Sequence, residues 1–383
     1  MPTPSRRCWL RFSLRSALIA VGILALILAC IGNLLHVYFA EQQVGAEIRN
    51  AGGNYETSLF GFMPDDSPNG WDDGPRLLRR IVLVRLSGSD IDDEKIARLQ
   101  LHRFKHLRSL SIGYEAVLGV DGPKWEDLAA PVTDKGLLSL PAFDKLRYLN
   151  LRDLPIGDVG LRGISEKYPS VEQFDLQGTL MTDVAMPEIG RIDGLMLLLI
   201  DDTSVTDAGL VHLGQLKDMR VLSMNNTRVA GSGLHHLAGL SKLHTLKLRA
   251  TGVSDDDVHH LTRLTRLRSL GLNGTRVSDD GVGCLASLTE LEYLELGNTA
   301  VTDAGVKCLV RLPRLSGLEL TGTLVTDQGL FELAKMPSLN HVSIDNVGVT
   351  KTGIDDFLSR KANRSVVYDN QVIYGEERPI ELD

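Results

Sequence analysis

The chain has 383 residues, of which 43% are hydrophobic, and a formal net charge of −8. All 49 acidic residues but only 37 of the 41 basic residues lie beyond residue 40, which leaves that part of the chain with a net charge of −12. An acidic body without a basic stripe binds nucleic acid or anionic lipid poorly. The charge therefore argues against a nucleic-acid partner.

The first expected element is an apolar segment at residues 17–40, which contains no Asp, Glu, Lys or Arg. A helix of this length can cross a hydrocarbon layer of about 30 Å. Four arginines and no acid precede the segment, at Arg6, Arg7, Arg11 and Arg15. By the positive-inside rule, residues 1–16 are a short cytoplasmic basic segment and the rest of the chain lies outside the cytoplasmic membrane, in a periplasm-like compartment.

Two alternatives to this uncleaved, single-pass signal anchor remain. A cleaved signal peptide is one, although the apolar run continues through Tyr38 and Phe39 and no small-x-small site ends a shorter core. The other is a lipoprotein, because residues 27–30 loosely resemble a processing box that would leave Cys30 acylated. The bulky Leu28 and the apolar residues after Cys30 favour the anchor.

Residues 41–77 are expected to join the anchor to the main domain. Val44 and Ile48 can line one side of a helix that continues out of the membrane and stops at Gly52 and Gly53. Residues 63–75 are rich in turn formers and predict a loop. We expect residues 54–80 to cover the open apolar end of the domain that follows, because a stack of repeats needs such a cap.

A repeat of 24 residues then dominates the chain. Its phrase is Val-Thr-Asp-Ala-Gly-Leu at Val205 to Leu210. The first residue of this phrase, here called the anchor position, occurs ten times in all, and a degenerate copy starts at Ile91. The ten anchor positions are Val132, Ile156, Met181, Val205, Val229, Val253, Val277, Val301, Val325 and Val349. A fixed period of this length predicts a solenoid, in which each unit buries its apolar edge against its neighbours.

Each repeat is expected to form a strand and then a helix. Alternating leucines such as Leu270 and Leu272 are typical of a strand with one buried side. The Ser or Thr and the Asp after the anchor position suit a helix start, where the hydroxyl caps free amides and the carboxylate meets the positive end of the dipole. Apolar residues five and eight positions beyond the anchor position predict a buried helical stripe.

Two further positions of the repeat carry the same residue type in most units, threonine before the anchor position and glycine after it. Threonine stands two positions before the anchor position in seven consecutive units, from Thr179 to Thr323. We expect its hydroxyl to pair backbone groups between successive coils, since such groups cannot reach water. Glycine at the position of Gly209 predicts close packing in the first helical turn. No GxGxxG or P-loop spacing supports phosphate binding there.

The pattern LxxLxLxxTx(V/I)(T/S)DxGLxxL resembles that of leucine-rich repeats, with Thr where many members have Asn. The resemblance covers residues 78–360, and with the apolar N-terminus it looks like membrane-anchored leucine-rich-repeat proteins common in planctomycete bacteria. It implies an α/β fold: a right-handed solenoid of about eleven coils, with a parallel sheet on the concave face and helices on the convex face. It also implies partner binding rather than chemistry. Residues 361–383 are the expected C-terminal cap and tail, with strands at 365–368 and 371–374.

The outward side chains of the strands should form the concave face. They lie six positions before each anchor position and two positions to either side. Exposed aromatic and apolar groups bordered by charge are typical of protein-binding surfaces, although a solvated strand face is an open alternative. The candidate partner-binding residues on this face are Tyr148, Arg152, Leu197, Leu199, Val221, Lys247, Arg249, Tyr293 and Glu295.

A tenth candidate, Trp125, lies in an insertion at residues 113–131 that lengthens one connection by about 15 residues. Long insertions in compact repeats tend to be functional or disordered. Trp125 is therefore either a contact residue or a side chain that folds back onto the neighbouring coil.

The helices carry a column of His212, His236 and His260, followed by Cys284 and Cys308. Packed helices lie about 8–10 Å apart, farther than the Cα separation of about 6.8 Å that a disulfide tolerates. Zinc between His236 and His260 is sterically feasible, but no CxxC or HExxH motif supports it. We expect solvated helix surface and no metal or other cofactor.

No GxSxG elbow or oriented Cys–His pair is present, and no glycine-rich nonapeptide supports a calcium stack on the repeated aspartates. The sequence predicts a non-catalytic, membrane-anchored recognition protein that binds a protein or a cell-envelope component through its concave face. The alternative is an envelope-structural or spacer protein without a specific ligand.

Overall fold

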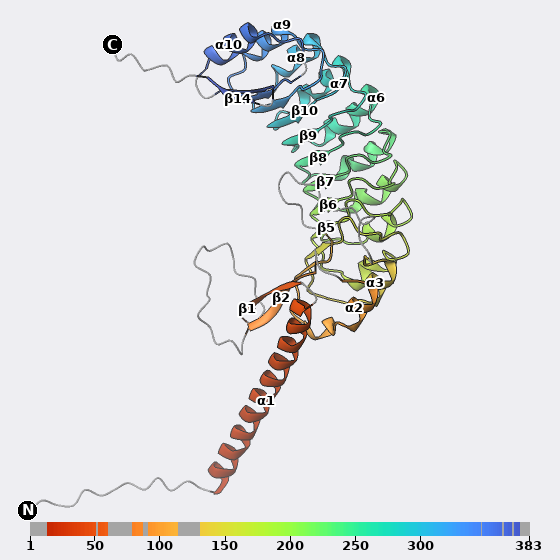
Figure 1. The fold of residues 1–383 in the computed structure, drawn as a ribbon, viewed down its shortest axis with the longest axis vertical. Coiled ribbons are helices and arrows are strands. Elements are labelled where there is room, and N and C mark those ends of the chain that lie inside the picture. The colour runs from red at the N-terminus through yellow and green to blue at the C-terminus, as the bar shows by residue number, and fades with distance from the viewer. Residues whose placement is uncertain are drawn as a thin grey trace, which may run out of the picture.

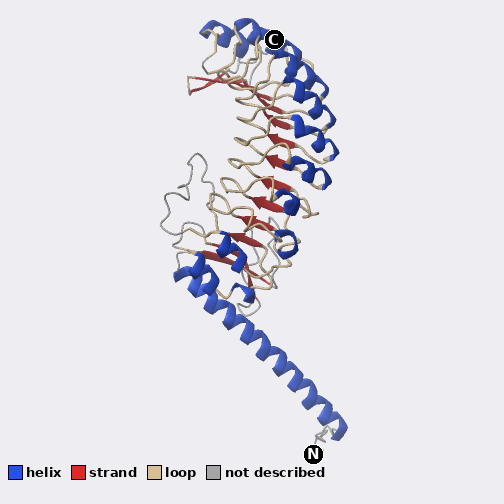
Figure 2. Cartoon of the chain, turned by 90° about the vertical axis from the view of Figure 1, so that its right-hand side faces the viewer, coloured by secondary structure: helices blue, strands red, loops and turns tan. Residues whose placement is uncertain are grey.

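The computed structural model describes residues 14–50, 53–59, 79–86, 91–113, 131–345, 347–361, 364–369 and 371–375. These residues form a curved stack in which the strands line the inner side and the helices the outer side (Figures 1 and 2). A long helix, α1 (Leu14–Asn50), projects from the N-terminal end of the stack (Figure 1). The predicted insertion lies outside the described residues except at its two ends, and so does Trp125.

The strands are β1 (Asn54–Leu59), β2 (Arg79–Arg85), β3 (Ser109–Ser111), β4 (Tyr148–Asn150), β5 (Gln173–Asp175), β6 (Leu197–Leu199), β7 (Val221–Ser223), β8 (Thr245–Lys247), β9 (Ser269–Gly271), β10 (Tyr293–Glu295), β11 (Gly317–Glu319), β12 (His341–Ser343), β13 (Ser365–Tyr368) and β14 (Gln371–Tyr374). They make one sheet in sequence order. Strands β2 to β13 are parallel, while β1 and β14 pair antiparallel at the two ends. The predicted parallel sheet and the two C-terminal strands are confirmed.

The α-helices after α1 are α2 (Asp93–Arg98), α3 (Asp134–Ser139), α4 (Ile164–Lys167), α5 (Met186–Ile189), α6 (Asp255–Val258), α7 (Asp279–Cys284), α8 (Asp303–Leu309), α9 (Asp327–Leu333) and α10 (Lys351–Ser359). The 3₁₀ helices are η2 (Leu101–Arg103), η4 (Gly209–Gln215), η5 (Ser232–Gly239), η6 (His259–Arg263) and η7 (Leu285–Ser287). Several coils thus carry a 3₁₀ helix where the sequence predicts an α-helix. A 24-residue coil leaves only a few residues for its outer side, and 3₁₀ geometry suits such short runs.

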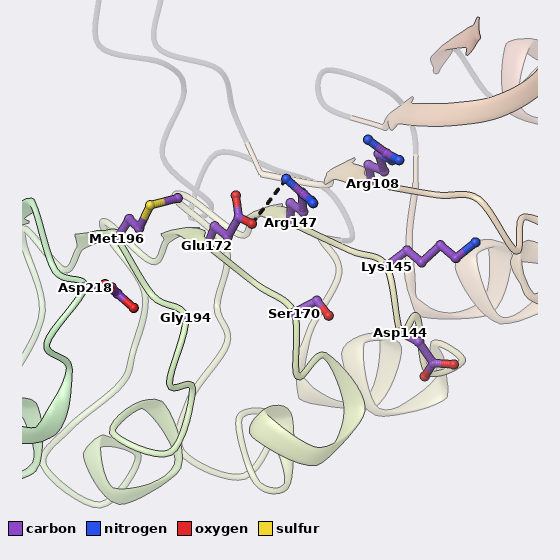
Figure 3. A pocket seen from close by; sticks show the side chains of 9 residues that line it. All are labelled: Arg108, Asp144, Lys145, Arg147, Ser170, Glu172, Gly194, Met196 and Asp218. Atoms are coloured by element: carbon purple, nitrogen blue, oxygen red, sulfur yellow. Dashed lines mark ion pairs between the residues drawn. The ribbon is translucent and has the colours of Figure 1, made fainter. Parts of the chain in front are cut away.

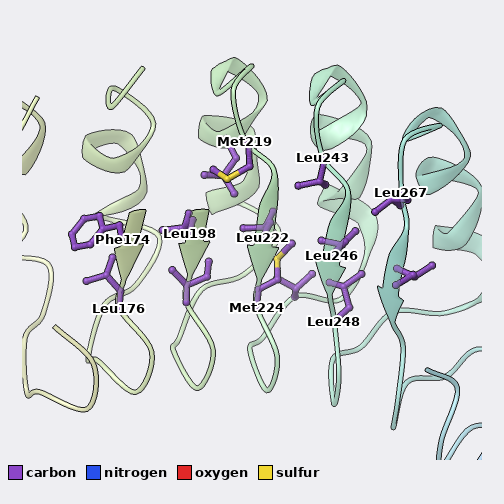
Figure 4. Packing of buried hydrophobic residues seen from close by; sticks show 14 of the residues in the cluster. Phe174, Leu176, Leu198, Met219, Leu222, Met224, Leu243, Leu246, Leu248 and Leu267 are labelled. Carbon is purple, nitrogen blue, oxygen red and sulfur yellow. The ribbon is translucent and has the colours of Figure 1, made fainter. Parts of the chain in front are cut away.

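The core runs the length of the stack as columns of leucines and other apolar side chains. The central strand residues Leu246, Leu270 and Leu294 stand in register and are buried. Figure 4 shows the same arrangement in earlier coils, where Phe174, Leu198 and Leu222 follow one another. Fully burying one such side chain contributes about 1.5–3 kcal/mol. Because these residues are covered by the next coil, one coil cannot form a core alone.

The repeated aspartates do more than begin helices, because each one reaches the next coil. Asp279 Oδ1 accepts a hydrogen bond from the Thr302 backbone N–H at 2.8 Å, and its Oδ2 accepts one from the Thr302 hydroxyl at 2.6 Å. The same pair of bonds joins coils from Asp158, Asp183, Asp255, Asp303 and Asp327. The Ser or Thr still caps its helix, as Thr302 does by accepting from Ala304 N–H. We call this series the aspartate ladder.

The regular spacing of glycine along the repeats follows from the aspartate ladder. A Cβ on Gly281 would lie within 3.0 Å of Asp255 Oδ1 in the preceding coil, and Gly209, Gly305 and Gly329 stand in the same relation to their own ladder aspartates. The amide of Gly281 also donates to Asp255 Oδ1 at 3.0 Å. The predicted close packing at these glycines is therefore confirmed, and its purpose is to admit the aspartate ladder.

The threonine column is buried as expected, but its predicted role between coils is wrong. From Thr179 to Thr323, all seven hydroxyls donate to the carbonyl three residues earlier in the same coil, at 2.5–2.8 Å. The acceptor is the residue that leaves the strand, such as Leu272 for Thr275. The hydroxyl satisfies a local turn because that turn bends the chain back within one coil.

The N-terminal end of the stack is closed by α1 as well as by β1. Val44 and Ile48 of α1 are buried, whereas Leu28, Leu35 and Phe39 are exposed. The predicted segment 17–40 falls within α1, although most of its side chains lie outside the described part of the structure. Among the described residues, no helix combines the length and apolar character needed to cross a membrane.

At the other end, one arginine holds the last coil together. Arg364 is 2% exposed. Its guanidinium donates to the carbonyls of Ala334 (3.0 Å), Met336 (2.9 Å), Phe357 (3.0 Å) and Leu339 (3.3 Å). These carbonyls belong to the end of the stack, where no further coil supplies donors.

Candidate functional site

The concave face divides into two stretches of different character. Towards the N-terminal end, from β3 to β7, short polar side chains form a hydrogen-bonded polar network. From β8 to β11, an exposed tyrosine stands among charged side chains and two glycines, and we call this the tyrosine shelf. Both stretches lie on the inner side of the curve (Figures 1 and 2).

The central column of the polar network is not exposed as the sequence suggests. Ser111, Asn150, Asp175 and Ser223 are all buried. The side chains are short and pack along the column: Asn150 Nδ2 donates to Ser111 Oγ at 3.1 Å, and its Oδ1 accepts from the backbone N–H of Arg152 at 2.8 Å. Strands about 4.8 Å apart bring such neighbours into contact.

The network continues from coil to coil through Arg152, Gln177 and Asp201. Arg152 donates to Gln177 Oε1, and Gln177 Nε2 donates to Asp201 Oδ2 at 2.6 Å. Asp201 Oδ1 then accepts from the Ser223 hydroxyl (2.6 Å) and from the Asn225 backbone N–H (2.7 Å). The predicted contact residue Arg152 is therefore half-buried and held in place by its neighbours.

Two carboxyl groups in this network have raised pKa values. Burial raises the pKa of Asp175 to about 6, with smaller raising effects from Asp201 and Asp153 and lowering effects from the Gln177 amide and Arg152. Burial also raises the pKa of Asp201, although hydrogen bonds from Ser223 and Asn225 oppose the shift. Buried carboxyl groups with shifted pKa values gather at functional sites more often than elsewhere.

The tyrosine shelf is built on two glycines. Tyr293 is 54% exposed, and its ring lies where a Cβ on Gly317 would be, 2.7 Å from the ring carbon Cδ1. Lys247 and Glu295 form an ion pair that spans the intervening strand β9, and a Cβ on Gly271 would come within 2.8 Å of Lys247 Cδ. The glycines thus allow the aromatic ring to lie over Gly317 and the ion pair to form across a coil.

The other predicted contact residues are less prominent. Leu197, Leu199 and Val221 are half-buried, and Leu197 pairs in register with Val221. Tyr148 is half-buried and Arg249 is exposed. The structure therefore places these nine predicted residues along one face and joins two of them, Lys247 and Glu295, in an ion pair. Their role in binding stays a prediction.

The histidine column on the convex side forms a ring cluster. The centroid of the His235 ring lies 3.8 Å from that of His236 and 5.6 Å from that of His260. No group of three or more His, Cys, Asp or Glu side chains in the described residues could hold a metal ion. Cys284 and Cys308 are free thiols. Desolvation is the first cause of the lowered pKa of His236 and His260, followed by their histidine neighbours.

The fold and the site define a repeat protein with one long inner sheet. A family model described as a leucine-rich repeat region matches residues 91–366, so the chain belongs to the leucine-rich repeat family. Leucine-rich repeat domains commonly mediate protein binding.

One solved structure supports the fold, and two others are similar at a lower level. An internalin from Listeria monocytogenes is similar, with 17% sequence identity and a TM-score of 0.52 over 75% of this chain and 86% of that one. A second internalin of the same species, internalin C2, shows 20% identity and a TM-score of 0.42 over 57% of this chain and 86% of that one. A plant peptide hormone receptor shows 14% identity and a TM-score of 0.42 over 69% and 48% of the two chains. No curated protein matches.

Two parts of the site were not foreseen in the sequence. Gly271 and Gly317 were not recognised as supports for the concave side chains, although they stand in strand positions that most coils fill with larger residues. Asp201 and Gln177 were not recognised as network members either. Their place in the repeat could have revealed them, because hydrogen-bonding side chains recur after the strands at Gln177, Asp201, Asn225 and Asn273.

Proposed function

We propose that this chain is a non-catalytic recognition protein that binds a protein or a cell-envelope component through the tyrosine shelf and the adjoining polar network. It does so as a single-pass membrane protein, with residues 1–16 in the cytoplasm and the repeats in a periplasm-like compartment.

The exposed ring of Tyr293 is the observation that carries the proposal. An exposed tyrosine offers a large apolar surface with a polar tip and loses little conformational freedom on binding, which is why tyrosine is enriched at interfaces. Here the ring is already oriented by Gly317, and the Lys247–Glu295 ion pair borders it. The rigid sheet beneath lowers the entropy cost of binding.

The membrane anchor is supported by a change in the surroundings of α1. Leu28 and Phe39 are 59% and 63% exposed, whereas Glu41, Val44 and Ile48 are buried against the first coils. Large exposed apolar side chains such as these are typical of a surface that lipid or another molecule covers. The change falls at the boundary near residue 40 that the sequence predicts.

Cross-linking of the full-length chain in intact cells tests the proposal. The wild-type chain should give a discrete cross-linked product, and Tyr293→Asp should reduce its yield at least about tenfold, because a buried interface aromatic contributes about 2 kcal/mol or more. Phe331→Asp is the matched control. Phe331 is 39% exposed on the convex helix α9, and its substitution should leave the product unchanged.

Equal losses in Tyr293→Asp and Phe331→Asp would contradict the assignment of the tyrosine shelf. The absence of any product from the wild-type chain would favour the spacer alternative. Single cysteines placed near residues 10 and 293, in a chain whose native Cys8, Cys30, Cys284 and Cys308 are replaced by Ser, test the orientation by their accessibility to a membrane-impermeant reagent. Only the cysteine near residue 293 is expected to react.

A further inference from the structure

One edge of the stack carries a basic cleft that the overall acidity of the chain conceals. The cleft has a volume of about 600 Å³ and lies beside the residues that lead into β7, β8 and β9. It is lined by Arg220, Lys242, His244, Arg266, Arg268 and Glu290. The expectation that the acidic body has no basic stripe is therefore wrong for this edge. That expectation failed because the net charge sums over the whole surface, whereas the repeat gathers basic side chains at this edge.

The repeat places these side chains in two adjacent columns. The amide of His244 donates to the Arg220 carbonyl, and the amide of Arg268 donates to the His244 carbonyl, both at 2.9 Å. Arg220, His244 and Arg268 are thus on successive rungs. Because rungs are about 4.8 Å apart, the two arginines are roughly 10 Å apart at the backbone and can both reach a group above His244.

Neighbouring acids neutralise only part of this charge. Lys242 pairs with Asp218 at 2.5 Å, and Arg268 approaches Glu292 at 3.8 Å. Glu290 pairs with Arg314 of the following coil. Within the described part of the chain, Arg220 and Arg266 form no ion pair, and both are exposed.

The adjoining cleft on the same edge differs from the basic cleft in the charge of its lining. It is lined by Arg108, Arg147, Glu172 and Asp218 among others, and Arg147 pairs with Glu172 at 3.3 Å (Figure 3). Acidic and basic groups are mixed there, whereas five of the six residues around the basic cleft are basic side chains. Of these two clefts, only the basic cleft has an excess of positive charge.

The pKa of His244 reflects the positive charge of the cleft around it. Desolvation lowers the pKa of its imidazole, and Arg268 and Arg220 lower it further. Its Nδ1 lies 3.1 Å from the Thr245 hydroxyl. A cation beside two arginines is unfavourable in the free protein, and an anion bound between them would relieve that repulsion.

We propose that the basic cleft is a binding site for a tetrahedral oxyanion, a phosphate or sulfate group carried by a small molecule or by an anionic polymer. Arg220 and Arg268 grip the group from the two outer rungs. Arg266 adds a third guanidinium, and His244 forms the floor. Guanidinium groups match such oxygens in geometry and form short, charge-assisted hydrogen bonds. The site is separate from the concave face.

Titration of the full-length chain in mild detergent tests this site with three probes: inorganic sulfate, dextran sulfate and uncharged dextran. We expect the charged polymer, the free anion or both to bind, with an affinity that falls as salt rises. Dextran should not bind. Binding of sulfate alone identifies a small ligand as sufficient, and binding of dextran sulfate alone identifies a polymer. Both outcomes support the site.

The Arg220→Gln/Arg266→Gln double variant should raise the Kd at least about tenfold, because two charge-assisted hydrogen bonds are lost. Arg228→Gln/Arg276→Gln is the matched control, since it removes two exposed arginines from the same two coils at the turns after the strands. Circular dichroism checks that both variants are folded. Failure of both charged probes to bind, unchanged affinity in the first variant, or an equal loss in the control overturns the proposal.

Discussion

Asp175→Asn isolates the energetic cost of the buried carboxyl group in the polar network. The folded protein holds the Asp175 pKa at about 6, against an ordinary value of 3.8 for an aspartate side chain. The folded state therefore binds this proton more tightly than the unfolded state does. Its contribution to stability is fully present below pH 4, and it is lost as pH rises through 6. At pH 7 the ionised carboxylate costs roughly 3 kcal/mol, at about 1.36 kcal/mol for each pKa unit.

Asparagine removes this cost and keeps the acceptor. The preceding coil has Asn150 at the same strand position, and its Oδ1 accepts from the amide two residues later, as Asp175 Oδ1 does from Gln177. We therefore expect Asp175→Asn to raise the free energy of unfolding by about 2–3 kcal/mol at pH 7 and by less than about 1 kcal/mol at pH 4.

Urea denaturation followed by circular dichroism measures both values. Asp193→Asn is the control: Asp193 is exposed in the turn before β6, and its side chain forms no hydrogen bond within the described residues. Its stability change should therefore stay within about 0.5 kcal/mol at both pH values. Loss of stability in Asp175→Asn at pH 7, or a gain that persists undiminished at pH 4, would refute the reasoning.

The aspartate ladder, the turns and the C-terminal cap give three further predictions, each measured by the same denaturation. Gly281→Ala should destabilise the protein by about 1–3 kcal/mol because the new methyl meets Asp255, whereas Gly283→Ala in the same helix has open space and should stabilise it by up to about 1 kcal/mol. The opposite order would contradict the close packing. Ala250→Gly should stabilise by about 0.5–1 kcal/mol, since this alanine has a φ of 54°; a loss there would mean that the turn is not strained. Arg364→Leu should cost about 3 kcal/mol or more by leaving four carbonyls without their donor. A cost below 1 kcal/mol would show that water replaces the guanidinium.

The sequence was sufficient to predict the architecture because the same pattern of residues recurs in each coil. Leucines such as Leu246 and Leu270 carry the period-2 strand signal, and their burial follows from stacking. The glycine at Gly281 was correctly assigned to close packing. Its partner was not, because the partner Asp255 lies one coil earlier and the sequence alone does not show which atoms meet between coils.

The candidate site was less predictable, since it depends on exposure rather than on period. Strand alternation places Asn150 and Asp175 on the outward side, yet side chains from neighbouring strands bury both. The threonine hydroxyls were assigned to the wrong acceptor for a related reason: a turn within a coil and a contact between coils leave the same periodic signal. The basic cleft was also missed, although Arg220, His244 and Arg268 recur at the repeat spacing.

The proposed recognition role is tested most directly by a photo-reactive amino acid placed at single positions of the full-length chain in living cells. At Tyr293 on the inner wall, irradiation should join the chain to one defined molecule, and at Phe331 on the outer helices it should not. Adducts of equal yield from both positions, or none from Tyr293, would contradict the claim that the inner sheet meets the partner.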